Sequence, residues 1–185
     1  MTDVKKAKVS LNNAKKNKFK LGVNSILHME GVNPALVEIA YKAIEITPID
    51  FGIPSTGGYR TGIEQKFLFH KGVTKADGLV KRSKHQDGLA LDFFAYVDGK
   101  GSWESEHLTA IAGAFKESAK QLGYVVEWGG DWPNFKDLPH IELVTTPGGD
   151  PLKVEKTATL ADSVVLAEPK IEEKNDPEIA GDEEV

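Results

Sequence analysis

Two short segments, far apart in the sequence, carry side chains that can bind one metal ion only if the fold brings them together. Residues 83–93 read Ser-Lys-His-Gln-Asp-Gly-Leu-Ala-Leu-Asp-Phe, with His85 and Asp92 seven positions apart and a glycine between them. Residues 137–142 read Asp-Leu-Pro-His-Ile-Glu and supply His140. Two imidazoles and a carboxylate suit zinc, and three protein ligands leave a fourth position for water. The pattern predicts a zinc site.

The surroundings of Asp92 support this prediction independently of the spacing. Asp92 follows apolar residues in a strand-like run, and a carboxylate buried there must be paired or bind a metal to offset its desolvation. A structural salt bridge is the alternative for Asp92, and a hydrogen-bonded loop histidine is the alternative for His85.

Composition excludes several classes of site and partner. The chain has no cysteine, so disulfides, thiolate zinc sites and cysteine nucleophiles are excluded. The formal net charge is −5, whereas a nucleic-acid binder needs a basic face, so we expect no nucleic-acid partner. No apolar run reaches the ~20 residues of a membrane span, and no apolar segment typical of a secretory signal follows the first lysines.

Charge divides the 185 residues into three parts. Residues 1–18 are rich in lysine and are expected to form a solvated arm or to approach an anionic surface. Residues 19–146 carry the helix and strand patterns of one domain. Residues 147–185 are acidic and lack aromatic residues, which predicts a disordered tail.

Hydrophobic periodicity predicts the secondary structure of the domain. Helices are expected over residues 34–46, 62–70 and 106–122; Asn33 is the N-cap of the first, and Gly123 ends the last. Strands are expected over residues 51–54, 89–97, 124–128 and 140–144. Alternation along the second strand would place Phe94 on the same face as Asp92. The mixture without a βαβ repeat predicts an α+β fold with a small, mainly antiparallel sheet and flanking helices.

Two carboxylates near His140 are candidates for proton transfer. Asp137, three residues before His140, can face the open metal position and act as a general base; an exposed loop aspartate is the alternative. Glu142 lies on the same strand face as His140 and is expected to orient a ligand or the substrate. Glu142 is also the rival candidate for the base.

The remaining site candidates are polar or aromatic. Arg60 comes shortly after a pair of glycines. Its guanidinium could bind a substrate carboxylate or stabilise a developing oxyanion. Ser83 is expected to donate a hydrogen bond rather than to act as a nucleophile. Trp128 and Trp132 either wall the cleft or belong to the core.

Calcium is not excluded as a further cation. Asp131, Asn134 and Asp137 offer three oxygens in one loop, whereas calcium usually takes 6–8. These three residues are too few to predict a calcium site.

At these residues the sequence resembles the zinc peptidases that cut bacterial cell-wall peptides, which include D-alanyl-D-alanine carboxypeptidases and dipeptidases and phage L-alanyl-D-glutamate endolysins. The family pattern Ser-x-His-x-x-Gly-x-Ala-x-Asp is complete from Ser83 to Asp92. Its Gly-Tyr-Arg-Thr element occurs at residues 58–61, and Gln65 follows where the family often has glutamine. The tryptophan-bounded Trp-Gly-Gly-Asp-Trp element at 128–132, and Asp137 in place of glutamate, favour the endolysin branch.

The resemblance implies a hedgehog/DD-peptidase-like fold with one zinc ion on His85, Asp92 and His140, and Asp137 as the base. It further suggests that Arg60 and Ser83 contact the substrate or the transition state. The implied activity is hydrolysis of the L-alanyl–D-glutamate bond in peptidoglycan stem peptides.

We accordingly expect a monomeric phage or prophage lysis protein. It would wait in the cytoplasm of the producing cell and act on the cell wall after holin-dependent release. A D-alanyl-D-alanine carboxypeptidase on the same scaffold, or a non-catalytic zinc-bearing wall-binding module, are the alternatives.

Overall fold

The computed structural model describes residues 19–153. The lysine-rich arm at 1–18 and residues 154–185 of the acidic segment lie outside the described residues. Within 19–153, no helix combines the length and the apolar character that crossing a membrane requires.

Two helices, α3 (Pro34–Ile46) and α5 (Ser105–Leu122), pack against each other and supply much of the core. The side chain of Asn33 accepts a hydrogen bond from the backbone N–H of Ala35 at 3.0 Å, which is the predicted N-cap. Gly123 ends α5 with φ 81°, a conformation that glycine adopts without strain. The inward face of α5 is almost fully buried at Leu108, Ile111, Ala112, Phe115 and Ala119.

The strands form two small antiparallel sheets. One sheet has the order β1 (Asp50–Gly52), β3 (Phe94–Val97) and β4 (Lys100–Ser102). The other has the order β2 (Ala90–Asp92), β6 (His140–Leu143) and β5 (Val126–Trp128). The predicted α+β class with flanking helices is therefore confirmed, although the structure has two small antiparallel sheets where one was expected.

The apolar run over residues 89–97 forms two strands, β2 and β3, where one strand was expected. Phe93 separates them, because its ring is fully buried and stacks on Phe115 with centroids 5.2 Å apart. The chain thus passes from one sheet to the other at this core residue. Phe94 belongs to the other sheet, so the expectation that it shares a strand face with Asp92 is wrong.

Pairing also continues past residue 146, where the domain was expected to end. Thr145 bridges to Pro151, and Tyr124 bridges to Lys153. The turn between them has Gly149 at φ 88° and closes with a hydrogen bond from Gly149 N to the Thr146 carbonyl. Residues 151–153 thus pair with the residues just before β5 and just after β6.

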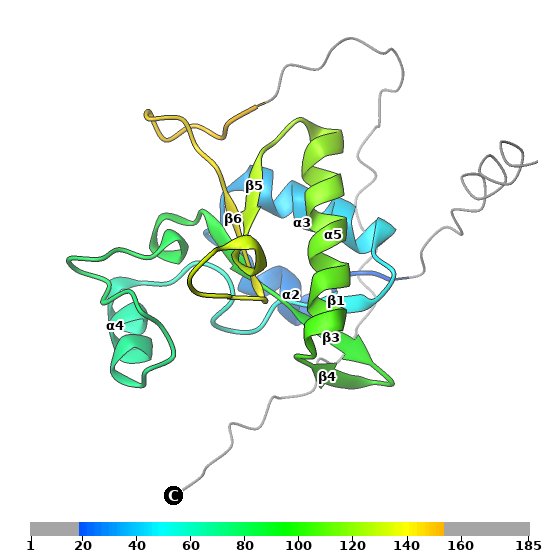
Figure 1. Cartoon of the computed structure of the whole chain (residues 1–185), viewed down its shortest axis with the longest axis horizontal. Helices are drawn as coiled ribbons and strands as arrows, with labels where there is room; N and C mark the ends of the chain where they lie inside the picture. The colour runs from blue at the N-terminus through cyan, green and yellow to red at the C-terminus, as the bar shows by residue number, and fades with distance from the viewer. Residues whose placement is uncertain (1–18, 154–185) are drawn as a thin grey trace, which may run out of the picture.

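The smaller helices lie at the edges of the core. They are α2 (Val23–His28), α4 (Gly62–His70), and the 3₁₀ turns η1 (Lys84–Asp87) and η2 (Gly129–Asp131). Figure 1 shows α5 in front of α3, with α4 and the loop that follows it standing apart at the left. That loop leads directly into η1, which carries His85.

Candidate metal centre

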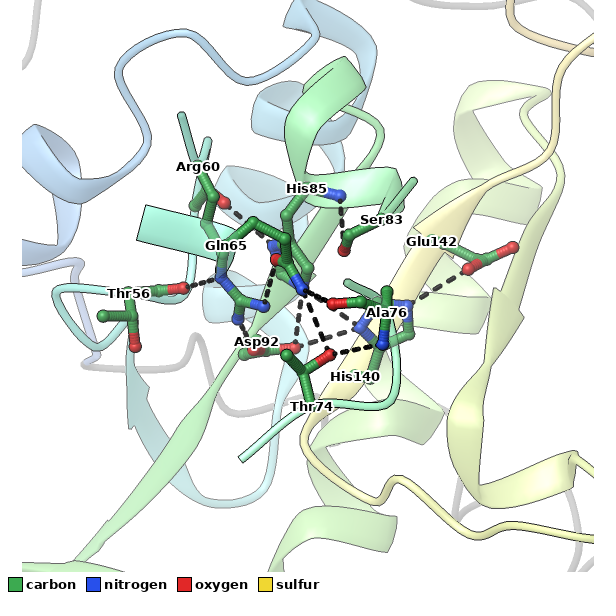
Figure 2. A network of polar contacts seen from close by, with 11 residues as sticks. Thr56, Arg60, Gln65, Thr74, Ala76, Ser83, His85, Asp92, His140 and Glu142 are labelled. Carbon is green, nitrogen blue, oxygen red and sulfur yellow. Dashed lines mark hydrogen bonds and ion pairs between the residues drawn. The ribbon is translucent and has the colours of Figure 1, made fainter. Parts of the chain in front are cut away.

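Three side chains from different elements converge at the end of the second sheet. The β2–β6 register places Asp92 opposite His140, and η1 supplies His85. Asp92 Oδ1 lies 3.0 Å from His140 Nδ1 and 3.2 Å from His85 Nε2, and those two nitrogens are 3.2 Å apart (Figure 2). All three potential ligand atoms thus lie within 4.8 Å of one another.

The second nitrogen of each imidazole has its own acceptor. His85 Nδ1 lies 2.8 Å from the Gly58 carbonyl, which can only accept, so Nδ1 carries the proton and Nε2 faces the other ligands. His140 Nε2 lies 3.1 Å from Glu142 Oε2, which leaves Nδ1 towards Asp92. Metal-binding histidines are usually oriented in this way by a carbonyl or a carboxylate. Two nitrogens and one carboxylate oxygen therefore fit a divalent cation of the zinc type.

The cluster is strongly coupled electrostatically. Burial raises the pKa of Asp92, but the charges and hydrogen bonds of His85 and His140 outweigh burial and hold that pKa well below its usual range. Burial lowers the pKa of His140, yet hydrogen bonds to Asp92 and Glu142 raise it to about 9. A cation would have to displace the proton on His140, so metal binding would release it.

Arg60 lies inside the cluster, where its guanidinium already has three protein acceptors. Nη2 donates to Asp92 Oδ2 at 2.5 Å, Nε donates to the Thr56 carbonyl at 2.6 Å, and Nη1 donates to Gln65 Oε1 at 3.5 Å. The side chain is buried, and two of its five N–H groups remain unused by these bonds. Arg60 therefore orients the Asp92 carboxylate.

Gln65 is a structural residue of the site whose role the sequence did not indicate. It is fully buried, and its Nε2 donates to Thr74 Oγ1 at 3.2 Å and to the Ala76 carbonyl at 2.9 Å (Figure 2). Gln65 thus links Arg60 to the loop after α4. In the sequence, only its place in a family motif pointed to a role for Gln65. Its two acceptors lie nine and eleven residues away, in a loop without periodicity, so spacing could not predict these hydrogen bonds.

Ser83 caps η1 beside the histidine. Its Oγ accepts from the His85 backbone N–H at 3.4 Å, and its own N–H donates to Gln86 Oε1 at 3.0 Å. This reciprocal pair is a capping box, which fixes the turn that presents His85. In this turn the Ser83 hydroxyl is an acceptor, and the expectation that Ser83 donates a hydrogen bond stays a prediction.

A cavity of about 650 Å³ opens beside the three potential ligands. Asp137 lines the cavity together with Arg60, Ser83 and Glu142. Asp137 is half-buried, and its pKa is raised by burial and by the negative charge of Asp92. Its backbone is held by Gly129, where an added Cβ would lie 2.3 Å from the Asp137 carbonyl oxygen. Asp137 therefore reaches the cavity from a closely packed turn.

The two tryptophans have different roles. Trp132 lines the cavity with its ring centroid 5.2 Å from that of His140, as expected for a cleft wall. Trp128 is buried in the core, and its Nε1 donates to the Leu138 carbonyl at 2.7 Å. Asp131 forms an ion pair with Lys116, so one of the three oxygens considered for calcium already has a cationic partner.

Lysines on the cavity wall are a feature that the sequence analysis missed. Lys75, Lys81 and Lys84 all line the cavity. They lie in a loop without periodicity, so nothing in the sequence separates them from lysines that only face solvent.

Comparisons with known proteins agree with this geometry. The sequence model of the family described as "Phage L-alanyl-D-glutamate peptidase" matches residues 17–149. The L-alanyl-D-glutamate peptidase of Escherichia phage T5 is 36% identical over 115 residues, which are 62% of this chain and 82% of the phage protein. The peptidoglycan L-alanyl-D-glutamate endopeptidase CwlK of Bacillus subtilis (strain 168) is 39% identical over 100 residues, which are 48% of this chain and 59% of CwlK.

A solved structure has the same fold. The Serratia marcescens L-Ala D-Glu endopeptidase ChiX superposes with a TM-score of 0.61 and 30% sequence identity, over 72% of this chain and 95% of ChiX. The resemblance to the phage L-alanyl-D-glutamate peptidases is thereby confirmed at the level of fold and family. The chain belongs to the phage L-alanyl-D-glutamate peptidase family.

Proposed function

We propose that this protein is a zinc-dependent endopeptidase that hydrolyses the bond between L-alanine and D-glutamate in the stem peptides of peptidoglycan. The observation that carries the proposal is the convergence of His85, Asp92 and His140 within 4.8 Å beside a cavity that Asp137 lines. The names of the phage T5 and Bacillus subtilis relatives support the choice of bond and of polymer.

His85, Asp92 and His140 would hold one zinc ion per chain through Nε2, a carboxylate oxygen and Nδ1. When bound, zinc supplies a Lewis acid that polarises the scissile carbonyl and acidifies a water molecule. Asp137 takes the proton from the attacking water and delivers it to the leaving nitrogen of D-glutamate. A raised pKa suits this task, because the same carboxyl must first accept and then donate a proton.

The other residues position these groups. Glu142 orients His140 and does not act as the general base, since its Oε2 is 3.1 Å from His140 Nε2. Arg60 holds Asp92, and its two remaining N–H groups are available to the substrate or to the developing oxyanion. Ser83 lines the cavity and is assigned to the same region of the substrate.

We further propose that the protein works as a monomer, since the described chain supplies every proposed ligand. Relatives encoded by Escherichia phage T5 and Listeria phage A118 support the role of a phage or prophage lysis protein. In that role it would wait in the cytoplasm until a holin opens the membrane.

Mass spectrometry of digested muropeptides tests the proposal. Purified protein should release peptides that begin with D-glutamate and leave L-alanine on the muramyl sugar. A chelator should abolish these products, and added zinc should restore them. Release of D-alanine alone would identify a carboxypeptidase, and zinc-dependent wall binding without any product would identify a non-catalytic module.

A further inference from the structure

We propose that Lys84, supported by Lys75 and Lys81, binds the free α-carboxylate of the D-glutamate residue in the substrate. The enzyme would then prefer stem peptides in which this carboxylate is not amidated. The inference rests on the proposed function and adds a determinant of specificity to it.

The substrate brings a negative charge to the reacting atoms. In the stem peptide D-glutamate continues through its γ-carboxyl group, so its α-carboxylate sits on the carbon that bears the scissile nitrogen. The cavity that must receive this anion is already lined by Asp92, Asp137 and Glu142. Arg60 and the proposed zinc ion would offset the charge of Asp92, whereas Asp137 and Glu142 would still repel an entering carboxylate, so a further cation nearby would favour its binding.

The two arginines of the cavity are already engaged. Arg60 donates to Asp92 at 2.5 Å and to the Thr56 carbonyl at 2.6 Å. Arg82 pairs with Asp87 at 2.5 Å. Arg60 can offer only its two remaining N–H groups to the substrate without breaking its bond to Asp92, and Arg82 would first have to leave its exposed ion pair with Asp87.

Three lysines of one segment, residues 75–84, also line the cavity. Lys75, Lys81 and Lys84 line it, and none of them forms an ion pair with a carboxylate of residues 19–153. Lys84 is half-buried and directly precedes His85, whereas Lys75 and Lys81 are exposed. Lys84 is therefore the cation closest in sequence to the metal site, and the other two would strengthen the field around it.

The segment that carries these lysines is held in place by two buried glutamines. Gln65 donates to the Ala76 carbonyl at 2.9 Å, and Gln86 donates to the Gly78 carbonyl at 3.0 Å. Gly78 has φ 80° and packs so closely that an added Cβ would lie 2.9 Å from Gln65 Cγ. The lysines thus project from a preorganised wall, which lowers the entropy cost of binding an anion.

The carboxylates and the lysines of the cavity come from different segments of the chain. The three carboxylates come from β2, β6 and the turn before β6, whereas the three lysines come from residues 75–84. A substrate across this cavity would place the leaving D-glutamate against the lysines.

Two synthetic peptides test the inference: L-alanyl-γ-D-glutamyl-L-lysine and the analogue in which D-isoglutamine replaces D-glutamate. The amide is close in size to the carboxylate but uncharged. The zinc-loaded wild-type protein should show a kcat/KM about ten to a hundred times higher for the acid, as expected for hydrogen bonds to a charged group. Lys84→Gln should lose most of this preference by slowing cleavage of the acid alone, and Lys84→Arg should retain it.

Lys66→Gln is the matched control, since Lys66 is an exposed lysine of α4 that does not line the cavity. Zinc content and thermal melting check that each variant is folded and loaded. An unchanged acid-to-amide ratio in both Lys84→Gln and the triple variant at 75, 81 and 84 would overturn the inference. Equal cleavage of both peptides by the wild type would also overturn it and leave the proposed function standing, whereas cleavage of neither would overturn the proposed function itself.

Discussion

The Nδ1 nitrogen of His85 lies 2.8 Å from the backbone carbonyl of Gly58, although the two residues are 27 positions apart. This bond selects the tautomer in which Nε2 is free to bind a metal. At Gly58 an added Cβ would lie 1.8 Å from the His28 carbonyl oxygen, so only glycine lets the backbone come this close. The backbone at Gly58 is therefore part of the candidate metal centre.

Gly58→Ala should weaken zinc binding about ten- to a hundredfold. The loop must move away from His28, and the Gly58 carbonyl that accepts from His85 Nδ1 moves with it. Titration against a competing chelator measures the change. Gly62→Ala is the control, since a Cβ there would meet only Gln86 Nε2, at 3.8 Å. Equal zinc affinity in the two variants would contradict the assigned role of Gly58.

Glu142→Ala should weaken zinc binding by a similar factor of about ten to a hundred, because His140 Nε2 loses the carboxylate that orients the ring. Glu127→Ala is a matched control from the facing position on β5, where the side chain is exposed. If Glu142→Ala instead keeps zinc and loses nearly all turnover, Glu142 rather than Asp137 is the base.

Asp137→Asn should lower kcat about 10²–10⁴-fold while zinc content stays the same, since the amide cannot accept the proton from water. Muropeptide cleavage and metal analysis of the same sample measure both quantities. Asp131→Asn, in the same loop, removes an exposed ion pair with Lys116 and should leave kcat nearly unchanged. Full activity in Asp137→Asn would remove Asp137 from the mechanism.

Zinc affinity should rise with pH up to about 9 and then level off. Below that pH His140 is protonated in the metal-free protein, because Asp92 and Glu142 raise its pKa to about 9, and zinc must displace this proton. Each unit of pH below 9 then costs about tenfold in affinity. Chelator competition across this range measures the slope, and an affinity that does not change between about pH 7 and pH 9 would contradict the coupling.

Local rules predict the helices of this protein well. Asn33 and Pro34 start α3, Gly123 ends α5, and the apolar stripe of α5 is the buried one. Each of these features depends on residues within one or two turns of one another, so sequence spacing carries the information. Local rules do not predict that residues 89–97 form two strands. This break depends on the packing of Phe93 against Phe115, more than twenty residues away.

The identity of the candidate metal ligands could be predicted from the sequence, since few residue types bind zinc and this chain has no cysteine. The tertiary structure decided what surrounds them. The Gly58 carbonyl behind His85, the engagement of Arg60 with Asp92, and the lysines that line the cavity all arise from contacts between distant segments. Backbone carbonyls are the same at every residue and an arginine has many possible acceptors, so only the folded chain determines which of them meet.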